Sequence, residues 1–236
     1  MDQKSLSRFH LSILHTESSE GWGGQEIRVL LESLGMIKRG HGGVIAASRR
    51  SHICAQAPKY GVEVLPFYFQ KKNLLSFWKK ASLIDREKIE IVNTHTSSDS
   101  WISSLAARLS RRKPQIIRTR HLSTPISKSF LSRLIYSNLP AAIITAGEEI
   151  RRRMIQDNGF DLAKIFSIPT GLDLDRFDPE RIKPAFRVVV LCTNPLLRER
   201  LGNVDQQMVR HSYSLERMPD RIEDLYAKLW PSLYSV

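Results

Sequence analysis

Short apolar runs alternate with longer segments of helical periodicity along most of the chain. The apolar runs predict seven strands, at residues 11–16, 42–48, 62–67, 89–95, 115–121, 141–146 and 165–170. The intervening segments predict helices at 25–38, 51–60, 74–86, 99–111, 127–138 and 147–157. Strands that are nearly continuous in apolar residues and separated by helices are typical of parallel sheets covered on both faces. The pattern therefore predicts an α/β fold with a doubly wound, Rossmann-like parallel sheet.

Polar residues gather where three of these strands end. His15 and Thr16 end the first strand, residues 93–95 the fourth, and residues 118–121 the fifth. Ligands of doubly wound sheets bind outside the carboxyl ends of the strands. The alternation alone therefore predicts a binding site at this edge.

A glycine turn joins the first strand to the first helix. Gly23 and Gly24 allow the backbone to turn tightly and to approach a ligand closely. The helix that follows directs its free N–H groups to the same place, which suits a phosphate. The turn lacks the full Gly-x-Gly-x-x-Gly spacing, so an ordinary strand-to-helix connection explains it equally well.

The segment GFDLAKIFSIPTGLDLDRF, residues 160–178, has the pattern of a domain junction, with an apolar run that ends at Pro169 and Gly171. It resembles the interdomain segment of group 1 (GT4-type) glycosyltransferases, which carry a similar Ile-Pro-Asn-Gly-Val-Asp…Phe string. The segment GGQEIRVLLESL resembles the start of the first helix in the same enzymes. The resemblance implies a GT-B fold of two Rossmann-like halves, with residues 1–172 as the first, acceptor-side half. Thr170 stands where the family usually has asparagine.

The resemblance also implies a reaction and roles for several residues. Family members move a sugar from a nucleoside-diphosphate sugar to an acceptor with retention at the anomeric carbon, and they require no cofactor and no metal. Gly23 and Gly24 would face the diphosphate, His121 would be the catalytic histidine near the reacting sugar, and His95 would bind substrate. From the residues alone, either histidine also fits a strand end, and Asp99 also fits the N-cap of the next helix.

Two arginines and two aspartates remain open to interpretation. Arg118 and Arg120 alternate along one strand and so point to the same face, where they fit either a substrate phosphate or surface ion pairs. Asp173 and Asp175 have a spacing that binds metal in a different glycosyltransferase fold. Here they lie within the linker string, so we assign them no metal.

The second half of the expected fold is too short. Only 65 residues follow Gly171, whereas a second Rossmann half needs on the order of 150. We expect a linker at 173–185 and a remnant at 186–236, with one strand at 186–192 and a segment, 194–230, that resembles the extreme C-terminus of the family. Most of the donor-binding half, including its Glu-x7-Glu motif, would then be missing. We therefore expect impaired transfer by this chain.

The tail contains one clear helical stripe. Its apolar positions recur every three to four residues, at Leu215, Met218, Ile222, Leu225, Leu229 and Trp230. With no complete second domain to cover, this stripe predicts a helix that packs on the N-terminal domain. Leu225 and Tyr226 are expected to be buried there.

The formal charge of +12 is uneven, since all but one of these charges lie in residues 1–186. Such an excess favours a phosphate-bearing substrate, an anionic membrane surface or nucleic acid, or is simply a solvated basic face. No nucleic-acid-binding motif is present, so we expect no nucleic-acid partner. In residues 71–84, apolar side chains lie between lysine pairs, which fits either a membrane-surface helix or a helix that covers the sheet while its lysines reach solvent.

The compartment follows from what the composition lacks. Cys54 and Cys192 have no metal-ligand spacing and suggest no disulfide framework. No segment reaches the roughly 18 apolar residues of a membrane span, and residues 11–14 are too short for a signal-peptide core. We expect a cytoplasmic protein, free or peripheral on the inner face of the membrane. It would transfer sugar to a glycan or lipid-linked acceptor in surface-polysaccharide or lipopolysaccharide assembly. The alternative is a non-catalytic acceptor-binding or membrane-surface module.

Overall fold

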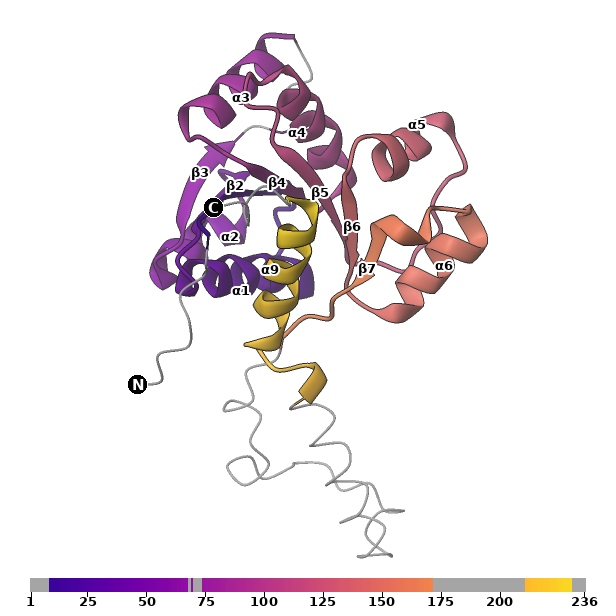
Figure 1. The fold of residues 1–236 in the computed structure, drawn as a ribbon. Coiled ribbons are helices and arrows are strands. Elements are labelled where there is room, and N and C mark those ends of the chain that lie inside the picture. Colours follow the sequence, from indigo (N-terminus) through magenta and orange to yellow (C-terminus); the bar gives the residue numbers. More distant parts are fainter. Residues whose placement is uncertain (1–8, 68, 70–73, 172–210, 231–236) are drawn as a thin grey trace, which may run out of the picture.

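The computed structural model describes residues 9–67, 69, 74–171 and 211–230. Seven parallel strands form one sheet in the order β3-β2-β1-β4-β5-β6-β7 (Figure 1). The strands are β1 (Ser12–Glu17), β2 (Gly42–Ser48), β3 (Glu63–Phe67), β4 (Ile91–Thr94), β5 (Gln115–Arg120), β6 (Ala142–Thr145) and β7 (Ile165–Ser167). The predicted doubly wound parallel sheet is confirmed. The strand order reverses between β1 and β4, so these two neighbours form the topological switch point.

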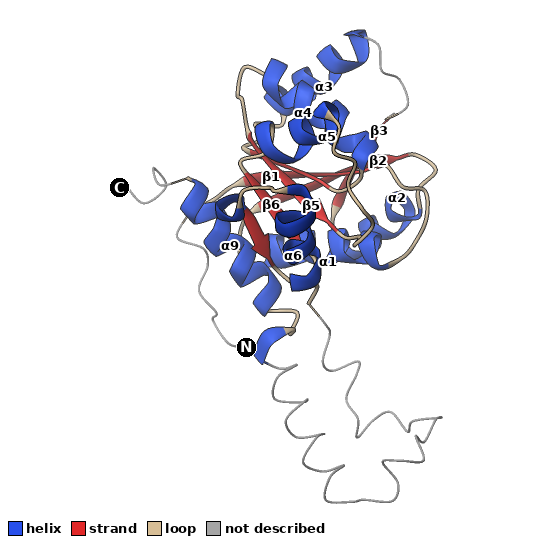
Figure 2. Cartoon of the chain, turned by 90° about the vertical axis from the view of Figure 1, so that its right-hand side faces the viewer, coloured by secondary structure: helices blue, strands red, loops and turns tan. Residues whose placement is uncertain are grey.

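Helices cover both faces of the sheet (Figure 2). They are α1 (Gly24–Lys38), α2 (His52–Gln56), α3 (Leu74–Arg86), α4 (Ser97–Leu109), α5 (Phe130–Arg133), α6 (Glu148–Asn158) and α9 (Arg217–Leu229). Short turns extend three of the connections, at η1 (Ala57–Tyr60), η2 (Leu134–Asn138) and η3 (Leu162–Lys164). Helices α1, α2 and α9 pack on one face, and α3 to α6 pack on the other. The central strands are thus buried on both sides, which explains why β4 and β6 contain only buried residues.

Two helix starts differ from the sequence prediction by more than one residue. The helix expected at 127–138 begins at Phe130, because the Ser129 hydroxyl accepts the Ser132 N–H, and it ends in the π-helical turn η2. Helix α4 is capped by Thr96, which has an extended backbone and whose hydroxyl accepts the Asp99 N–H. Asp99 is therefore the third helical residue and completes a capping box, rather than serving as the N-cap.

The closing helix α9 packs on the N-terminal domain beside α1, as the apolar stripe predicts (Figure 1). Met218, Ile222, Leu225 and Tyr226 are buried in one cluster with residues of β1, β4, β5 and β6. Each such side chain contributes on the order of 1.5–3 kcal/mol when fully removed from water. The expected burial of Leu225 and Tyr226 is confirmed.

Polar contacts along both sides of α9 fix its position. Arg39 of α1's C-terminal end forms an ion pair with Asp220 and donates to the Glu216 carbonyl at 2.8 Å. On the other side, Arg221 donates to the Ser167 carbonyl of β7. Since exposed pairs contribute little stability, these contacts set the orientation of α9 while its apolar stripe supplies most of the energy.

Several predictions fall outside the described residues. They concern the linker at 173–185, the strand at 186–192 and the Asp173–Asp175 pair.

Candidate active site at the switch point

Three histidines lie in a row across the carboxyl ends of β1, β4 and β5. His15 Nδ1 is 3.2 Å from His95 Nε2, and His95 Nδ1 is 3.0 Å from His121 Nε2. Neighbouring rings stack with centroids 5.5 and 5.2 Å apart. The strand order brings them together, since β1 pairs with β4 and β4 pairs with β5. The sequence pattern marked His15 only as a polar strand end, and its place in this row was missed.

The histidine row is neutral at physiological pH. His15 and His95 are buried, and His121 is the half-buried outer member. Burial, together with the charge of nearby Arg28, lowers the pKa of His15 to about 3. Burial and the charges of Arg28 and Arg118 lower the pKa of His121 to about 3 as well. The pKa of His95 is also well below its usual value, mainly because of burial and its two neighbouring histidines.

A buried arginine of α1 fastens the segment that follows β7. Arg28 Nη1 donates to the Ile168 carbonyl at 2.7 Å and to Thr170 Oγ1 at 3.2 Å. Its Nε lies 3.6 Å from a Glu32 carboxylate oxygen. Thr170 therefore contacts the first helix even though it replaces the asparagine that is usual in the resembled family.

Further buried polar groups continue from this arginine. Asn93 Nδ2 donates to Glu32 at 2.9 Å, and Thr119 Oγ1 donates to Asn93 Oδ1 at 2.9 Å. Burial raises the pKa of both Glu32 and Tyr226, the latter reaching this region from α9. Helix α9 thus closes the polar cluster that supports the histidine row.

The cap of α4 holds the middle histidine. Asp99 Oδ1 accepts the backbone N–H of His95 at 3.1 Å, and Asp99 Oδ2 accepts that of Thr96 at 2.9 Å. Burial raises the pKa of Asp99 to about 6 despite these hydrogen bonds. The capping box therefore fixes the backbone from which His95 projects.

Arg118 and Arg120 share one partner, which confirms that they point to the same face. They donate to the Tyr136 hydroxyl at 2.8 and 2.6 Å, and their guanidinium carbons lie 4.3 and 5.5 Å from its ring centroid. Arg118 is buried and also donates to the Thr96 carbonyl at 3.2 Å. Within the described ranges neither guanidinium pairs with a carboxylate, so the ion-pair alternative is not what the structure shows. A phosphate contact stays a prediction.

The glycine turn leaves open space at the start of α1. Gly23 is the extended N-cap, and its N–H donates to Glu26 Oε2 at 2.8 Å. A Cβ added at Gly24 would meet no protein atom within 4 Å. Nearby, the buried Glu17 accepts Gln25 Nε2 at 2.6 Å, and burial and Asp99 raise the Glu17 pKa to about 8. Sequence reasoning missed Glu17, whose only signal was its place directly after the first apolar run.

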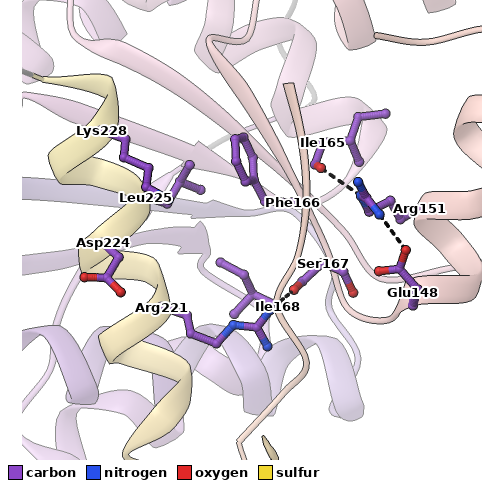
Figure 3. A pocket seen from close by; sticks show the side chains of 10 residues that line it. All are labelled: Glu148, Arg151, Ile165, Phe166, Ser167, Ile168, Arg221, Asp224, Leu225 and Lys228. Atoms are coloured by element: carbon purple, nitrogen blue, oxygen red, sulfur yellow. Dashed lines mark hydrogen bonds and ion pairs between the residues drawn. The ribbon is translucent and has the colours of Figure 1, made fainter. Parts of the chain in front are cut away.

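A separate cavity of about 330 Å³ lies at the β7 edge of the sheet, between α6 and α9 (Figure 3). There Arg151 Nε donates to the Ile165 carbonyl at 3.0 Å, and Arg221 reaches the Ser167 carbonyl. None of the three histidines lines this cavity. It is therefore distinct from the switch-point site.

The three histidines do not resemble a metal site. They follow one another end to end instead of converging on a point. Across the ranges that the structure describes, no group of three His, Cys, Asp or Glu side chains could hold a metal ion.

A comparison with protein-family models decides the family. Residues 22–176 match the model of Glycosyltransferase Family 4. The chain belongs to this family. The chain is also 31% identical over 116 residues to the Escherichia coli UDP-Gal:alpha-D-GlcNAc-diphosphoundecaprenol alpha-1,3-galactosyltransferase. This match covers 46% of the chain and 29% of the relative.

Solved structures show the same fold. A glycosyltransferase from Rickettsia africae matches with a TM-score of 0.62 and 18% identity, and the match covers 74% of the present chain and 47% of the Rickettsia chain. Anabaena HepE in complex with UDP-glucose matches with a TM-score of 0.59 and 14% identity, and the match covers 70% of the present chain and 45% of the HepE chain. The chain thus spans less than half the length of these relatives.

Proposed function

We propose that this protein is a sugar transferase whose site is the carboxyl edge at the β1–β4 switch point. The substrates would be a nucleoside-diphosphate sugar and a glycan or lipid-linked acceptor, as in surface-polysaccharide or lipopolysaccharide assembly, with retention at the anomeric carbon. The family membership carries this proposal, and the histidine row at the switch point supports it. The named substrates of the Escherichia coli relative, a UDP-sugar and a diphosphoundecaprenol-linked sugar, favour a lipid-linked acceptor.

Each candidate residue at the carboxyl edge of the sheet has a role in this proposal. Gly23, Gly24 and the first turn of α1 bind the donor's diphosphate, since the open space at Gly24 admits an anion beside the helix N-terminus. His121 is the catalytic histidine, which hydrogen-bonds an oxygen of the reacting sugar or positions the acceptor. His95 supports it from behind. Arg120, whose guanidinium is less buried than that of Arg118, contacts a substrate phosphate.

We further propose that the 236-residue chain alone transfers sugar poorly. When a sugar is transferred from a nucleoside-diphosphate sugar, hydrogen-bond donors in fixed positions must stabilise the departing diphosphate. One half of a two-domain enzyme supplies only part of them. A non-catalytic acceptor-binding or membrane-surface module is the second candidate function, and the exposed Trp78 and Lys79 of α3 favour it.

Turnover with a panel of nucleotide sugars and polyprenyl-diphosphate-linked acceptors tests this proposal. We expect little or no transfer by the chain, and calorimetric binding of the acceptor that weakens in a His121→Ala variant. Rapid transfer that is lost in His121→Ala would show that this half suffices. Absence of both transfer and binding would contradict the proposed function.

The membrane is the remaining proposed partner. In the part of the chain that the structure describes, no helix is long and apolar enough to cross a membrane. Contact at a surface through α3 is supported by Trp78, which is 54% exposed, and by the exposed Lys79. Lys80 is not part of that surface, because it is buried with its Nζ 4.7 Å from the Phe67 ring centroid. A peripheral location on the inner face of the membrane therefore stays a proposal.

A further inference from the structure

The hydrogen bonds of the histidine row admit two arrangements of protons. A neutral imidazole donates from one ring nitrogen and accepts with the other. In the first arrangement, His15 Nδ1–H donates to His95, and His95 Nδ1–H donates to His121 Nε2, so that His121 carries its proton on Nδ1. In the second, every donor and acceptor is exchanged, and His121 carries its proton on Nε2.

The inner end of the row distinguishes the two arrangements. His15 Nε2 is buried and makes no hydrogen bond with any described residue. The first arrangement leaves only a lone pair at this atom. The second leaves a buried N–H without an acceptor, which native structures rarely tolerate. The first arrangement is therefore the more stable one.

Buried arginines near the row help to keep the three rings neutral, which both arrangements require. The Arg28 guanidinium lowers the affinity of both His15 and His121 for a proton, and its buried Nη2 has no hydrogen-bond acceptor among the described residues. Among the described residues, its only close carboxylate is that of Glu32, at 3.6 Å, and burial raises the pKa of that group. A neutral ring has one N–H group, and in the first arrangement all three N–H groups are directed from His15 toward His121.

We propose that His15 and His95 are positioning residues that hold His121 in the tautomer with its proton on Nδ1, so that His121 acts as a hydrogen-bond donor to substrate and not as a proton acceptor. The proposal rests on the proposed function only in naming a substrate oxygen as the partner. His121 Nδ1 forms no hydrogen bond within the described part of the chain, and it lies on the ring edge away from His95. The outer ring thus has one free donor, fixed in place by two buried rings.

Nitrogen-15 spectra of the histidine rings in the full chain, without substrate, test the proposal. In the unmodified protein we expect His121 to carry its proton on Nδ1. His15→Phe keeps a ring but removes the donor at the inner end, so His121 should become a mixture of both tautomers. His15→Asn places an amide N–H near the position of Nδ1 and should restore the original tautomer.

The control and the contrary results are distinct. A His52→Phe variant changes an exposed histidine outside the row and should leave His121 unchanged. If the unmodified protein carries the His121 proton on Nε2, the proposal is wrong. This result does not depend on whether His15→Phe folds. If His15→Phe folds and leaves the tautomer unchanged, His15 is not a positioning residue.

This measurement is independent of turnover. A chain with the expected tautomers and neither transfer nor acceptor binding would contradict the proposed function and support the positioning of His121. Where transfer is measurable, His15→Phe should lower kcat by about 10-fold to 100-fold, the size of loss known for metal-bound histidines that lose their hydrogen-bond partner. His15→Asn should recover most of that loss, whereas the KM of the nucleotide sugar should change little.

Discussion

At the scale of single residues, this protein keeps titratable groups in states that they do not have in water. Burial lowers the pKa of His15 and His121 to about 3 and raises that of Glu17 to about 8. The histidines are therefore neutral, and Glu17 is largely protonated at neutral pH. We therefore expect this edge of the sheet to bind a ligand through neutral donors and the nearby arginines.

The neutral histidines make stability depend on pH. The folded pKa of His15 is about 3 and its ordinary value is 6.5, so below pH 6.5 the unfolded chain takes up a proton that the folded chain excludes. Each pH unit below 6.5 should therefore remove about 1.4 kcal/mol from the free energy of unfolding. Relative to a His15→Asn variant, the unmodified protein should lose about 2 kcal/mol between pH 6.5 and pH 5.

Urea unfolding of both proteins at these two pH values measures the difference. The comparison with His15→Asn matters, because Glu17 and Asp99 have raised pKa values and act in the opposite direction in both proteins. Equal pH dependence of the two proteins would show that His15 has the same pKa in the folded protein as in the unfolded chain. His52→Asn, which removes an exposed histidine, serves as the control.

At the scale of elements, α1 and α9 approach each other more closely than side chains normally allow. A Cβ added at Gly35 would lie 2.1 Å from Pro219 Cγ. In the segment after β7, a Cβ added at Gly171 would lie 2.7 Å from Leu215 Cα. These two glycines let the tail lie against the N-terminal domain.

Gly35→Ala should therefore destabilise the protein by about 1–3 kcal/mol, the usual cost of overpacking a close contact. Gly24→Ala is the matched control, because it also adds a methyl group to α1 but meets no atom within 4 Å. Thermal unfolding of the two variants gives the comparison. A Gly35→Ala protein as stable as the control would mean that α9 can shift without cost.

The same scale shows what the sequence could and could not predict. Strand and helix positions followed from apolar runs, and α3 begins and ends where its periodicity indicated, at Leu74 and Arg86. The packing of α9 followed from its stripe. The cap of α4 did not, since Thr96, Ser97, Ser98 and Asp99 are all good capping residues and only the backbone geometry distinguishes them.

The histidine row marks the same limit. Each histidine could be placed at a strand end from the sequence. Their mutual hydrogen bonds could not, because they depend on which strands are neighbours and on ring orientation. Arg28 gave no signal at all, since a charged residue within a helix is usually exposed.

At the scale of the whole molecule, the excess of positive charge has no use inside the described fold beyond a few buried arginines. Most lysines and arginines of the described ranges are exposed, and the charge of +12 is compatible with a partner surface of opposite sign. The exposed Trp78 and Lys79 of α3, with Lys71 and Lys72 just before that helix in sequence, give one place where an anionic bilayer could bind. Such binding would bring the chain to a lipid-linked acceptor.

We expect the protein to sediment with vesicles that contain anionic phospholipid and to be released by salt, because attraction between exposed charges is screened over about 10 Å at 0.1 M salt. Substitution of Lys71, Lys72 and Lys79 by glutamine should weaken this binding several-fold. Lys80 is left unchanged, because its side chain is buried and its loss would disturb the fold. The matched control replaces three exposed lysines elsewhere, Lys38, Lys59 and Lys88, and thus removes the same charge. Equal losses in the two triple variants would assign the binding to net charge alone, and equal sedimentation with neutral and anionic vesicles would exclude an electrostatic membrane contact.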